Sequence, residues 1–446
     1  MGNIATIQTT KSQTRISLRN ELIIFFSLLV FGLVVGTIGA LSLNNFLFFL
    51  YITTYIVLLF LFLKVNHYQL INISTFFVFY LSYAVLLGPL FGWGFNITYV
   101  SNPFIFLLGF ALFIVGLSFY NKKYYDKPLK SREFPGIFHF NKLFVVLVFY
   151  FLGIAACLYY FMINRQALSS DLNAGRATAL SGNGLLILFI KSLSITTAML
   201  LELCLKGKIS KVTYVLLLGV AVVSSFIVGF KAIPITIAIV SALIYANNKK
   251  LSLKTVLIIL IFIFVSYLLL QAIRDSVSAT KTNDSLIKRL KMMYVDSINF
   301  DRVVYWFPKN TGFQYGSTLL INFKMLLPGP DMDFTTWLKT TLQMTYDGGG
   351  FTPTIFGDFY INFSYPGIFV GMLLYGVVCG FINKRYEKTK INWLVAYVSW
   401  EFVHSITGGL SNVLMDMVVF TILGIFIESI SQEKVYYVRV TQLKLE

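Results

Sequence analysis

Arginine residues outside the apolar stretches are the first candidates for chemistry in this sequence. Arg165 and Arg176 lie in one polar segment, and Arg274 and Arg302 lie in a second, much longer one. A guanidinium group is planar, stays charged and offers a fork of N–H donors that fits phosphate oxygens. Lys231, in a tight turn between two apolar stretches, adds a further cation. These residues predict a phosphate-binding site, with contacts to lipid head groups or ion pairs with neighbouring acids as the alternative.

Acids and aromatic residues share the longer polar segment with two of these arginines. Asp301 or Asp358 could orient a hydroxyl group or take its proton. Trp306, Tyr315 and Tyr360 could stack on the apolar faces of sugar rings while their polar tips form hydrogen bonds. The same aromatic types form the interfacial belts of membrane proteins, which is the alternative explanation for them.

Histidine and cysteine are missing from both polar segments. The three histidines and three cysteines lie elsewhere, at His67, His139, His404, Cys157, Cys204 and Cys379. No C-x-x-C spacing occurs, so neither a disulfide framework nor a thiolate site is indicated. We therefore expect no metal ion and no other cofactor at a site built from these segments.

Composition restricts the class of protein strongly. The chain has 446 residues, of which 57% are hydrophobic and only 12% charged, and its mean hydropathy is +0.76. A soluble globular domain is far less apolar, so the chain is expected to be an integral membrane protein. The net charge of +17 could suggest nucleic acid. The lysines and arginines instead form short clusters between apolar stretches, which is typical of membrane topology, and we expect no nucleic-acid partner.

Apolar stretches long enough to cross a bilayer recur along the chain. About 17 to 25 apolar residues are needed to cross a hydrocarbon core of about 30 Å. Twelve stretches qualify, starting near Leu22, Phe46, Leu70, Asn102, Leu143, Gly184, Val212, Ala232, Thr255, Pro366, Trp393 and Asn412. The predicted fold class is an all-α polytopic membrane protein with about twelve transmembrane helices and two external loops, one large and one small.

The distribution of basic residues orients these spans. Every second connection is rich in lysine and arginine, as the positive-inside rule requires, so both termini are expected in the cytoplasm. The predicted divisions are a cytoplasmic segment 1–20, spans one to nine in 21–271 with the small external loop 164–183, the large external loop 272–365, spans ten to twelve in 366–430, and a cytoplasmic tail 431–446.

The large loop is expected to be folded. Its residues 283–306 alternate apolar and basic positions in the manner of an amphipathic helix lying at the membrane surface. Turn signals at 310–312, 328–330 and 347–350 divide the remainder into short pieces. Asp331-Met332-Asp333 follows Pro-Gly-Pro and is interpreted as part of a turn rather than as the D-x-D motif of nucleotide-sugar transferases.

Four charged residues lie within predicted spans, where an unpaired charge is costly. Lys191 and Asp416 lie near the outer ends of their helices, and Glu401 lies in the eleventh predicted span. Glu202 lies near an inner end and is expected to extend its carboxylate toward the cytoplasmic surface. Structural ion pairs are the default interpretation for this set, although Lys191 is close enough to the outer end to reach an external diphosphate.

Several short segments resemble a known family. Gly357-Asp358-Phe359-Tyr360-Ile361-Asn362-Phe363, between Thr352-Pro353-Thr354 and Pro366-Gly367-Ile368, resembles the end of the large outer loop in bacterial O-antigen or oligosaccharide repeat-unit polymerases of the Wzy type. The segments 226–231 and 315–329 resemble a glycine-bounded basic turn and the middle of that loop. Arg165 to Gly175 and Arg302 to Gly312 are equally spaced, one residue shorter than the arginine-to-glycine spacing of the family.

The resemblance implies a specific function. Such an enzyme, of GT-C-like polymerase or ligase architecture, transfers a growing glycan from undecaprenyl diphosphate to a hydroxyl group of a lipid-linked repeat unit at the outer face of the bacterial inner membrane. The product is O-antigen, capsule or a related surface glycan, and neither nucleotide nor metal is required. The partners would be the two lipid-linked oligosaccharides, membrane lipids and, where one exists, a chain-length regulator protein.

The resemblance also assigns roles to the candidate residues. Arg165, Arg176, Lys231, Arg274 and Arg302 would bind the diphosphates, and Arg302 would also stabilise the charge that develops on the leaving group. Asp301 or Asp358 would act on the acceptor hydroxyl, and Trp306, Tyr315 and Tyr360 would contact the glycan.

Three other classes fit parts of the sequence. An internal repeat in the sequence would favour a lipid-linked oligosaccharide flippase or other transporter, and no such repeat is evident. An O-antigen ligase-like glycosyltransferase usually presents a histidine in its large outer loop, and this loop contains none. A membrane-embedded binding or scaffold protein would not need so many outward-facing arginines.

Overall fold

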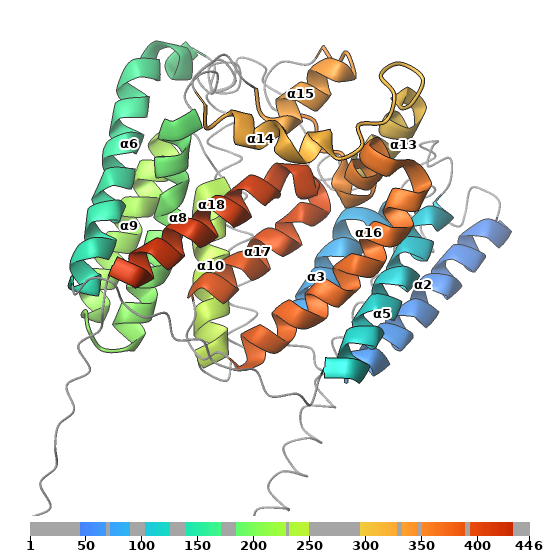
Figure 1. Ribbon diagram of the computed structural model, residues 1–446, viewed down its shortest axis with the longest axis horizontal. Helices are drawn as coiled ribbons and strands as arrows, with labels where there is room; N and C mark the ends of the chain where they lie inside the picture. The colour runs from blue at the N-terminus through green and yellow to red at the C-terminus, as the bar shows by residue number, and fades with distance from the viewer. Residues whose placement is uncertain are drawn as a thin grey trace, which may run out of the picture.

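The computed structural model describes residues 45–67, 72–89, 103–124, 140–170, 184–228, 232–248, 295–327, 332–345, 350–388 and 393–430. Within these ranges every secondary-structure element longer than a single bridge residue is a helix (Figure 1). The predicted spans near Leu22 and Thr255 lie outside the described residues. The all-helical part of the predicted fold class is therefore confirmed for the described part of the chain.

Long apolar helices form the body of the molecule. They are α2 (Asn45–Val65), α3 (Ile73–Leu81) with its π-helical extension η1 (Ser82–Leu86), α5 (Phe104–Tyr124), α6 (Lys142–Ser170), α8 (Gly184–Leu205), α9 (Lys211–Ile227), α10 (Ala232–Asn248), α16 (Thr354–Lys388), α17 (Trp393–Gly408) and α18 (Leu410–Ile430). Short helices lie together across one end of this bundle, at the top of Figure 1: α13 (Val295–Trp306), η3 (Ser317–Leu320), α14 (Ile321–Lys324) and α15 (Phe334–Thr341). We call this the loop end.

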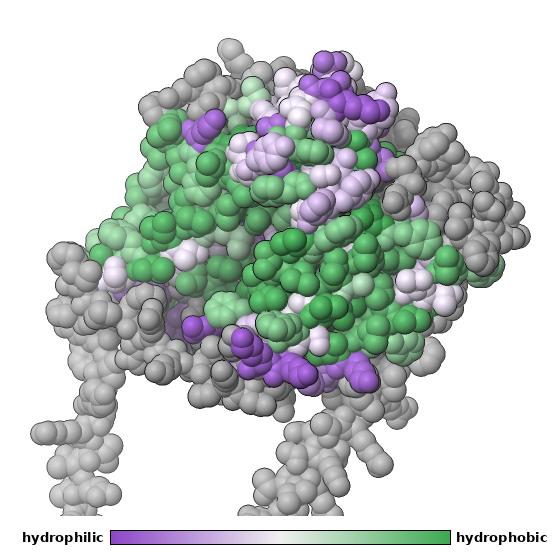
Figure 2. All heavy atoms as spheres, turned by 45° about the vertical axis from the view of Figure 1, so that its right-hand side comes forward, coloured by the Kyte–Doolittle hydropathy of each residue, from purple (hydrophilic) through white to green (hydrophobic). Residues whose placement is uncertain are grey.

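The bundle has the surface of a membrane protein. Five described helices are long and apolar enough to cross a bilayer, at Phe104–Lys123, Lys142–Asn164, Gly184–Leu205, Thr354–Tyr386 and Leu410–Ile430. Large apolar side chains such as Phe144, Met162 and Leu216 point outward on these and neighbouring helices. Figure 2 shows a broad hydrophobic belt with hydrophilic residues above and below it. The chain is thus a multi-pass membrane protein, and the number of twelve spans stays a prediction.

Glycines allow the closest helix contact in the bundle. A Cβ atom added at Gly376 of α16 would lie 2.0 Å from the backbone oxygen of Phe113 in α5. A Cβ atom at Gly116 of α5 would lie equally close to the backbone oxygen of Leu373. Small residues let two membrane helices approach until their backbones touch, so α5 and α16 form a rigid pair.

A charge cluster joins four helices at the end opposite the loop end. Lys142 lies at the start of α6 and hydrogen-bonds Glu428 of α18, and its ammonium is 3.6 Å from Glu202 of α8. Glu202 also pairs with Lys206 at 2.9 Å, and the backbone N–H of Trp393 donates to it at 3.4 Å. The expectation that Glu202 extends to the surface was wrong, because these partners satisfy its carboxylate while it stays buried.

Helix α16 begins at Thr354, ahead of Pro366, where the last group of spans was predicted to begin. The part from Thr354 to Asn362 is helical and mostly buried, so the end of the predicted large loop forms the first turns of this helix. Backbone angles leave the helical region at Phe363 and Ser364, where the helix bends. The bend coincides with the predicted boundary between loop and span.

The bend in α16 holds the loop. Proline has no N–H, so Pro366 cannot bond the carbonyl group of Asn362 four residues earlier. That carbonyl oxygen instead accepts the N–H of Tyr315 at 3.0 Å, and the preceding carbonyl, of Ile361, accepts the N–H of Gln314 at 2.9 Å. The interrupted helix therefore provides two backbone acceptors that fix residues 314–315 above it.

Candidate functional site

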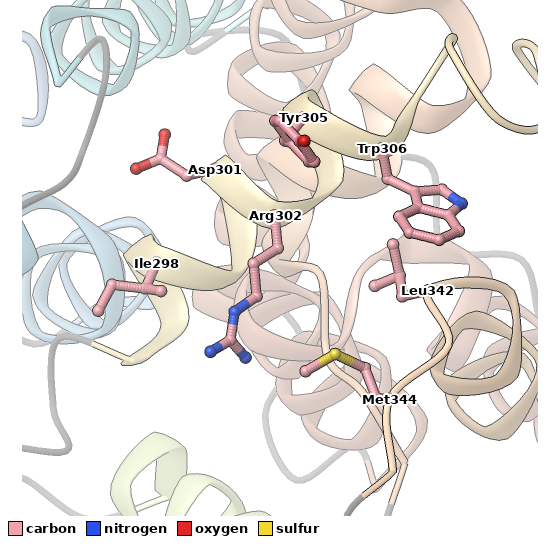
Figure 3. A pocket seen from close by; sticks show the side chains of 7 residues that line it. All are labelled: Ile298, Asp301, Arg302, Tyr305, Trp306, Leu342 and Met344. Atoms are coloured by element: carbon pink, nitrogen blue, oxygen red, sulfur yellow. The ribbon is translucent and has the colours of Figure 1, made fainter.

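A pocket opens at the loop end between α13 and the chain that follows α15. Its volume is about 510 Å³, and it is lined by Ile298, Asp301, Arg302, Tyr305, Trp306, Leu342 and Met344 (Figure 3). Three residues that the sequence nominated for diphosphate binding, acceptor chemistry and glycan contact are thus brought together by one short helix. Apolar side chains form most of the remaining wall.

Helix α13 places these residues by its amphipathic pattern. Arg302 and Trp306 are four residues apart and therefore lie on one face of the helix. Phe300, Val303 and Phe307 lie on the opposite face and are buried in the core. The apolar side anchors α13 against the bundle, so its other side carries the functional groups into the pocket.

Arg302 is the exposed cation of this pocket. Its side chain extends from α13 toward Met344, whereas the Asp301 carboxylate extends from another side of the helix (Figure 3). Trp306 contributes an indole N–H that is buried and has no hydrogen-bond partner among the described residues. The arrangement offers a fork of donors for an anion beside an apolar surface that suits a sugar ring or an isoprenoid chain.

The two tyrosines nominated for glycan contact have different surroundings. Tyr315 is 76% exposed on the outer surface of the loop, where its left-handed backbone conformation precedes Gly316. Tyr360 is buried beneath α13, and its ring contacts Phe300 and Phe313. Tyr315 can therefore meet a ligand directly, while Tyr360 supports the floor on which α13 rests.

Asp358 lies in the interior and not in the pocket. Its side chain is almost fully buried, with 1% exposed, in the first turns of α16. The two carboxylate oxygens accept the N–H and the hydroxyl of Ser411, both at 2.7 Å. Asn362 donates a third hydrogen bond at 3.2 Å. The carboxylate thus caps the first turn of α18, a position where helices favour negative charge.

The loop is attached to the same turn of α18. Thr318 of η3 exchanges a hydrogen bond with the Ser411 hydroxyl at 2.8 Å. Asn322 of α14 donates to the carbonyl oxygen of Asn412 at 2.8 Å and accepts the N–H of Phe334, the first residue of α15, at 2.7 Å. A continuous set of polar contacts therefore connects α18 to α15, whose far end leads into the pocket wall.

Sequence reasoning missed this connecting set. Thr318, Asn322 and Ser411 are small polar residues without a motif, and their partners are far away in the chain. One signal was available for Asp358, because Phe356 and Ile361 around it are apolar and an acid in such a run is expected to be buried with partners.

The surroundings of the other nominated cations fall outside the described part of the chain. Arg165 lies near the end of α6, with its side chain outside the description, and Arg176, Lys231 and Arg274 lie outside the described residues. Their roles stay predictions. In the part of the chain that the structure describes, no group of three or more histidine, cysteine or acidic side chains could hold a metal ion.

Fold and site together define a class: a multi-pass membrane protein in which a folded polar segment covers one end of the bundle and presents an arginine-lined pocket there. The comparison with protein families names the group. The chain belongs to the family described as putative O-antigen polymerase, whose model matches residues 46–420 and so includes both the bundle and the loop. No curated protein and no solved structure matches the chain significantly. Membership of this family implies glycan polymerisation.

Proposed function

We propose that this protein is a polysaccharide polymerase that transfers a growing glycan from undecaprenyl diphosphate to a lipid-linked repeat unit. The observation that carries the proposal is the pocket at the loop end, which Arg302, Asp301 and Trp306 of α13 all line. Lipid-linked substrates reach such a site from the bilayer with their diphosphates at the surface. The loop end then faces the outside of a bacterial inner membrane, in agreement with the basic connections at the other end.

Each of the three side chains has a role that its position supports. Arg302 binds the diphosphate of one lipid-linked substrate through its guanidinium fork. Asp301 orients a hydroxyl group of the glycan, and Trp306 packs against a sugar ring while its unpartnered N–H donates to a sugar oxygen. Tyr315 extends the contact surface for the glycan. A fixed cation in a partly apolar site stabilises phosphate charge more than it would in water.

Replacing Arg302 tests the proposal. In membranes supplied with lipid-linked repeat units, Arg302→Ala should stop the formation of long polymer and leave single repeat units on the lipid. We expect a decrease in kcat/KM of about 10- to 100-fold, because a hydrogen bond to a charged group contributes about 1.5–3 kcal/mol. Arg302→Lys should recover part of the activity, because the charge remains while the fork is lost.

Lys324→Ala is the matched control, since Lys324 is an exposed cation on α14 at the same end but outside the pocket. It should give the chain-length ladder of the unchanged protein. A normal ladder from Arg302→Ala would refute the assignment of the pocket. The proposal that no metal ion is required predicts an unchanged ladder in the presence of EDTA, and a loss that added Mg²⁺ restores would refute that part alone.

A further inference from the structure

A second group of ionisable side chains lies inside the bundle below the loop end. Lys191 of α8 contacts Asp416 of α18 at 2.7 Å. Nδ1 of His404 in α17 lies 3.4 Å from Glu401, three residues earlier in the same helix. Helix α17 packs against both α8 and α18, so the two pairs lie near each other and we treat the four residues as one cluster. Ionisable residues among membrane helices are rare, and they commonly mark functional sites.

The cationic ends of the cluster are accessible and the acids behind them are not. The side chains of Lys191 and His404 are 33% and 32% exposed, whereas those of Asp416 and Glu401 are 12% and 6% exposed. The buried carboxylates of Asp416 and Glu401 therefore position the more exposed side chains of Lys191 and His404. Trp400 stacks on the imidazole ring at 5.5 Å with an interplanar angle of 4°, which fixes the plane of the ring. With Nδ1 directed at Glu401, Nε2 of His404 has no hydrogen-bond partner among the described residues and can meet a ligand.

The cluster contains more acidic groups than permanent cations. Lys191 contributes one ammonium group, and Asp416 and Glu401 bring two carboxyl groups into a low-dielectric region. One oxygen of Asp416 is also buried without a hydrogen-bond partner among the described residues, so the cluster is incomplete without a further donor or positive charge.

Neighbouring helices add few other charges to this balance. Tyr397 lies one helical turn before Glu401 on α17, and Asp333, at the start of α15, is the acidic residue of the loop end that enters this balance. The carboxylate of Asp358 in α16 already accepts two hydrogen bonds from Ser411. Helix α10, which packs against α8 and α17, contains no charged residue.

We infer that His404, oriented by Glu401, accepts the proton of the acceptor hydroxyl, with Lys191 beside it as a cation for the departing diphosphate. This rests on the proposed polymerase function and deepens it. The acceptor oxygen forms a bond with the anomeric carbon of the donor, and the bond from that carbon to the diphosphate oxygen breaks with its electron pair on the diphosphate. The hydroxyl proton passes to Nε2 and then to the diphosphate or water. A base held by a carboxylate is a recurrent catalytic arrangement.

Helix α15 connects this cluster with the pocket. Asn322 ties its first residue, Phe334, to Asn412 of α18, the helix that carries Asp416, and Leu342 and Met344, just after the end of α15, line the pocket of Arg302. Its eight residues span about 12 Å. The polymerase needs places for two lipid-linked substrates, so the cluster serves the donor and the pocket serves the acceptor lipid. Asp301 then orients the glycan without taking its proton.

The charge cluster at the opposite end shows what a structural ion pair looks like in this protein. Lys142 and Glu202 are both buried, and their charged groups face each other and further partners. No described histidine belongs to that cluster, and Glu202 has no unpartnered oxygen among the described residues. The group around His404 differs in containing a histidine, in the Asp416 oxygen that has no hydrogen-bond partner among the described residues, and in its position beneath the loop.

The experiment uses the full chain in nanodiscs with lipid-linked repeat units, and it records polymer formation against pH. His404→Gln should decrease kcat at least 100-fold with little change in KM, and should abolish the decline of kcat at acid pH. His404→Ala should regain at least tenfold activity with added imidazole, because the exposed position leaves room for the free base. His67→Gln, at the opposite end of the bundle just after α2, is the control and should keep the normal profile.

The outcomes separate the inference from the proposed function. If the unchanged protein polymerises repeat units while His404→Gln keeps its kcat and pH profile, the inference is overturned and the function stands. If His404→Ala is inactive, retains the thermal stability of the unchanged protein and gains nothing from imidazole, a role as base is also overturned. If the unchanged protein forms no polymer while transporting lipid-linked units across vesicles, the proposed function itself fails.

Discussion

Replacing Asp358 by asparagine distinguishes two roles for this acid. In the structural role, the two carboxylate oxygens of Asp358 accept the N–H and the hydroxyl of Ser411, both at 2.7 Å, and so hold the α17–α18 hairpin. Asparagine keeps only one of these oxygens. Its NH₂ group would face one of the two Ser411 donors, and two donors cannot form a hydrogen bond. A hydrogen bond to a charged group contributes about 1.5–3 kcal/mol. Losing one of the two bonds to Ser411 and weakening the other should therefore lower the stability of the hairpin by about 3 kcal/mol. This corresponds to about a hundredfold increase in local opening.

Amide hydrogen exchange of the full chain in nanodiscs measures this opening. Protection should fall about a hundredfold in residues 317–345 and in the first turn of α18, because Thr318 and Asn322 attach the loop to that turn. Asp333→Asn is the control, since Asn caps helix α15 about as well as Asp and should leave exchange unchanged. Loss of polymer with normal protection in Asp358→Asn would refute the structural role and support the predicted role in acceptor chemistry.

Three other predictions concern packing, buried charge and orientation. Gly184→Val should separate the loop from α8 and lower stability by about 1–3 kcal/mol in thermal unfolding, because a Cβ atom there would lie 2.0 Å from the backbone oxygen of Met325. Lys142→Met should cost about 3 kcal/mol by leaving Glu428 without its ammonium partner, and an unchanged melting temperature would contradict this. Tyr315→Cys should react with a membrane-impermeant maleimide in intact cells whose outer membrane has been permeabilised, and labelling only after lysis would reverse the proposed orientation.

Features of the fold that depend on local composition could be predicted from the sequence. The apolar stretches starting near Phe46, Leu143 and Gly184 coincide with helices because a run of that length must satisfy its backbone internally in a bilayer. The amphipathic pattern of residues 283–306 predicted a helix, and α13 forms one over Val295–Trp306, the part of that range that the structure describes. Local rules failed at the start of α16, where Pro366 suggested a boundary but the helix continues through a bend.

The missing part of the prediction consists of long-range partners. Nothing near Lys191 in the chain identifies Asp416, 225 positions away, as its counter-ion. In the same way, the contact of Asn322 with Phe334 and Asn412 follows from the way the loop folds back on α18. Residue types show which groups need a partner, because unpaired polar groups are costly in a membrane protein. The three-dimensional arrangement decides which partner each group obtains.

Helices α15 and α18 determine how the two proposed substrate sites, the pocket of Arg302 and the cluster of His404, lie relative to each other. Asn322 holds the start of α15 against α18, the helix that also carries Asp416. A shift of α18 at Asn412 would therefore be passed to the start of α15, whose other end leads to Leu342 in the pocket wall. Distances between the two substrates then depend on α15 and α18 more than on the exposed loop surface. Substitutions at Asn322 should therefore lower kcat while Arg302 and His404 remain in place.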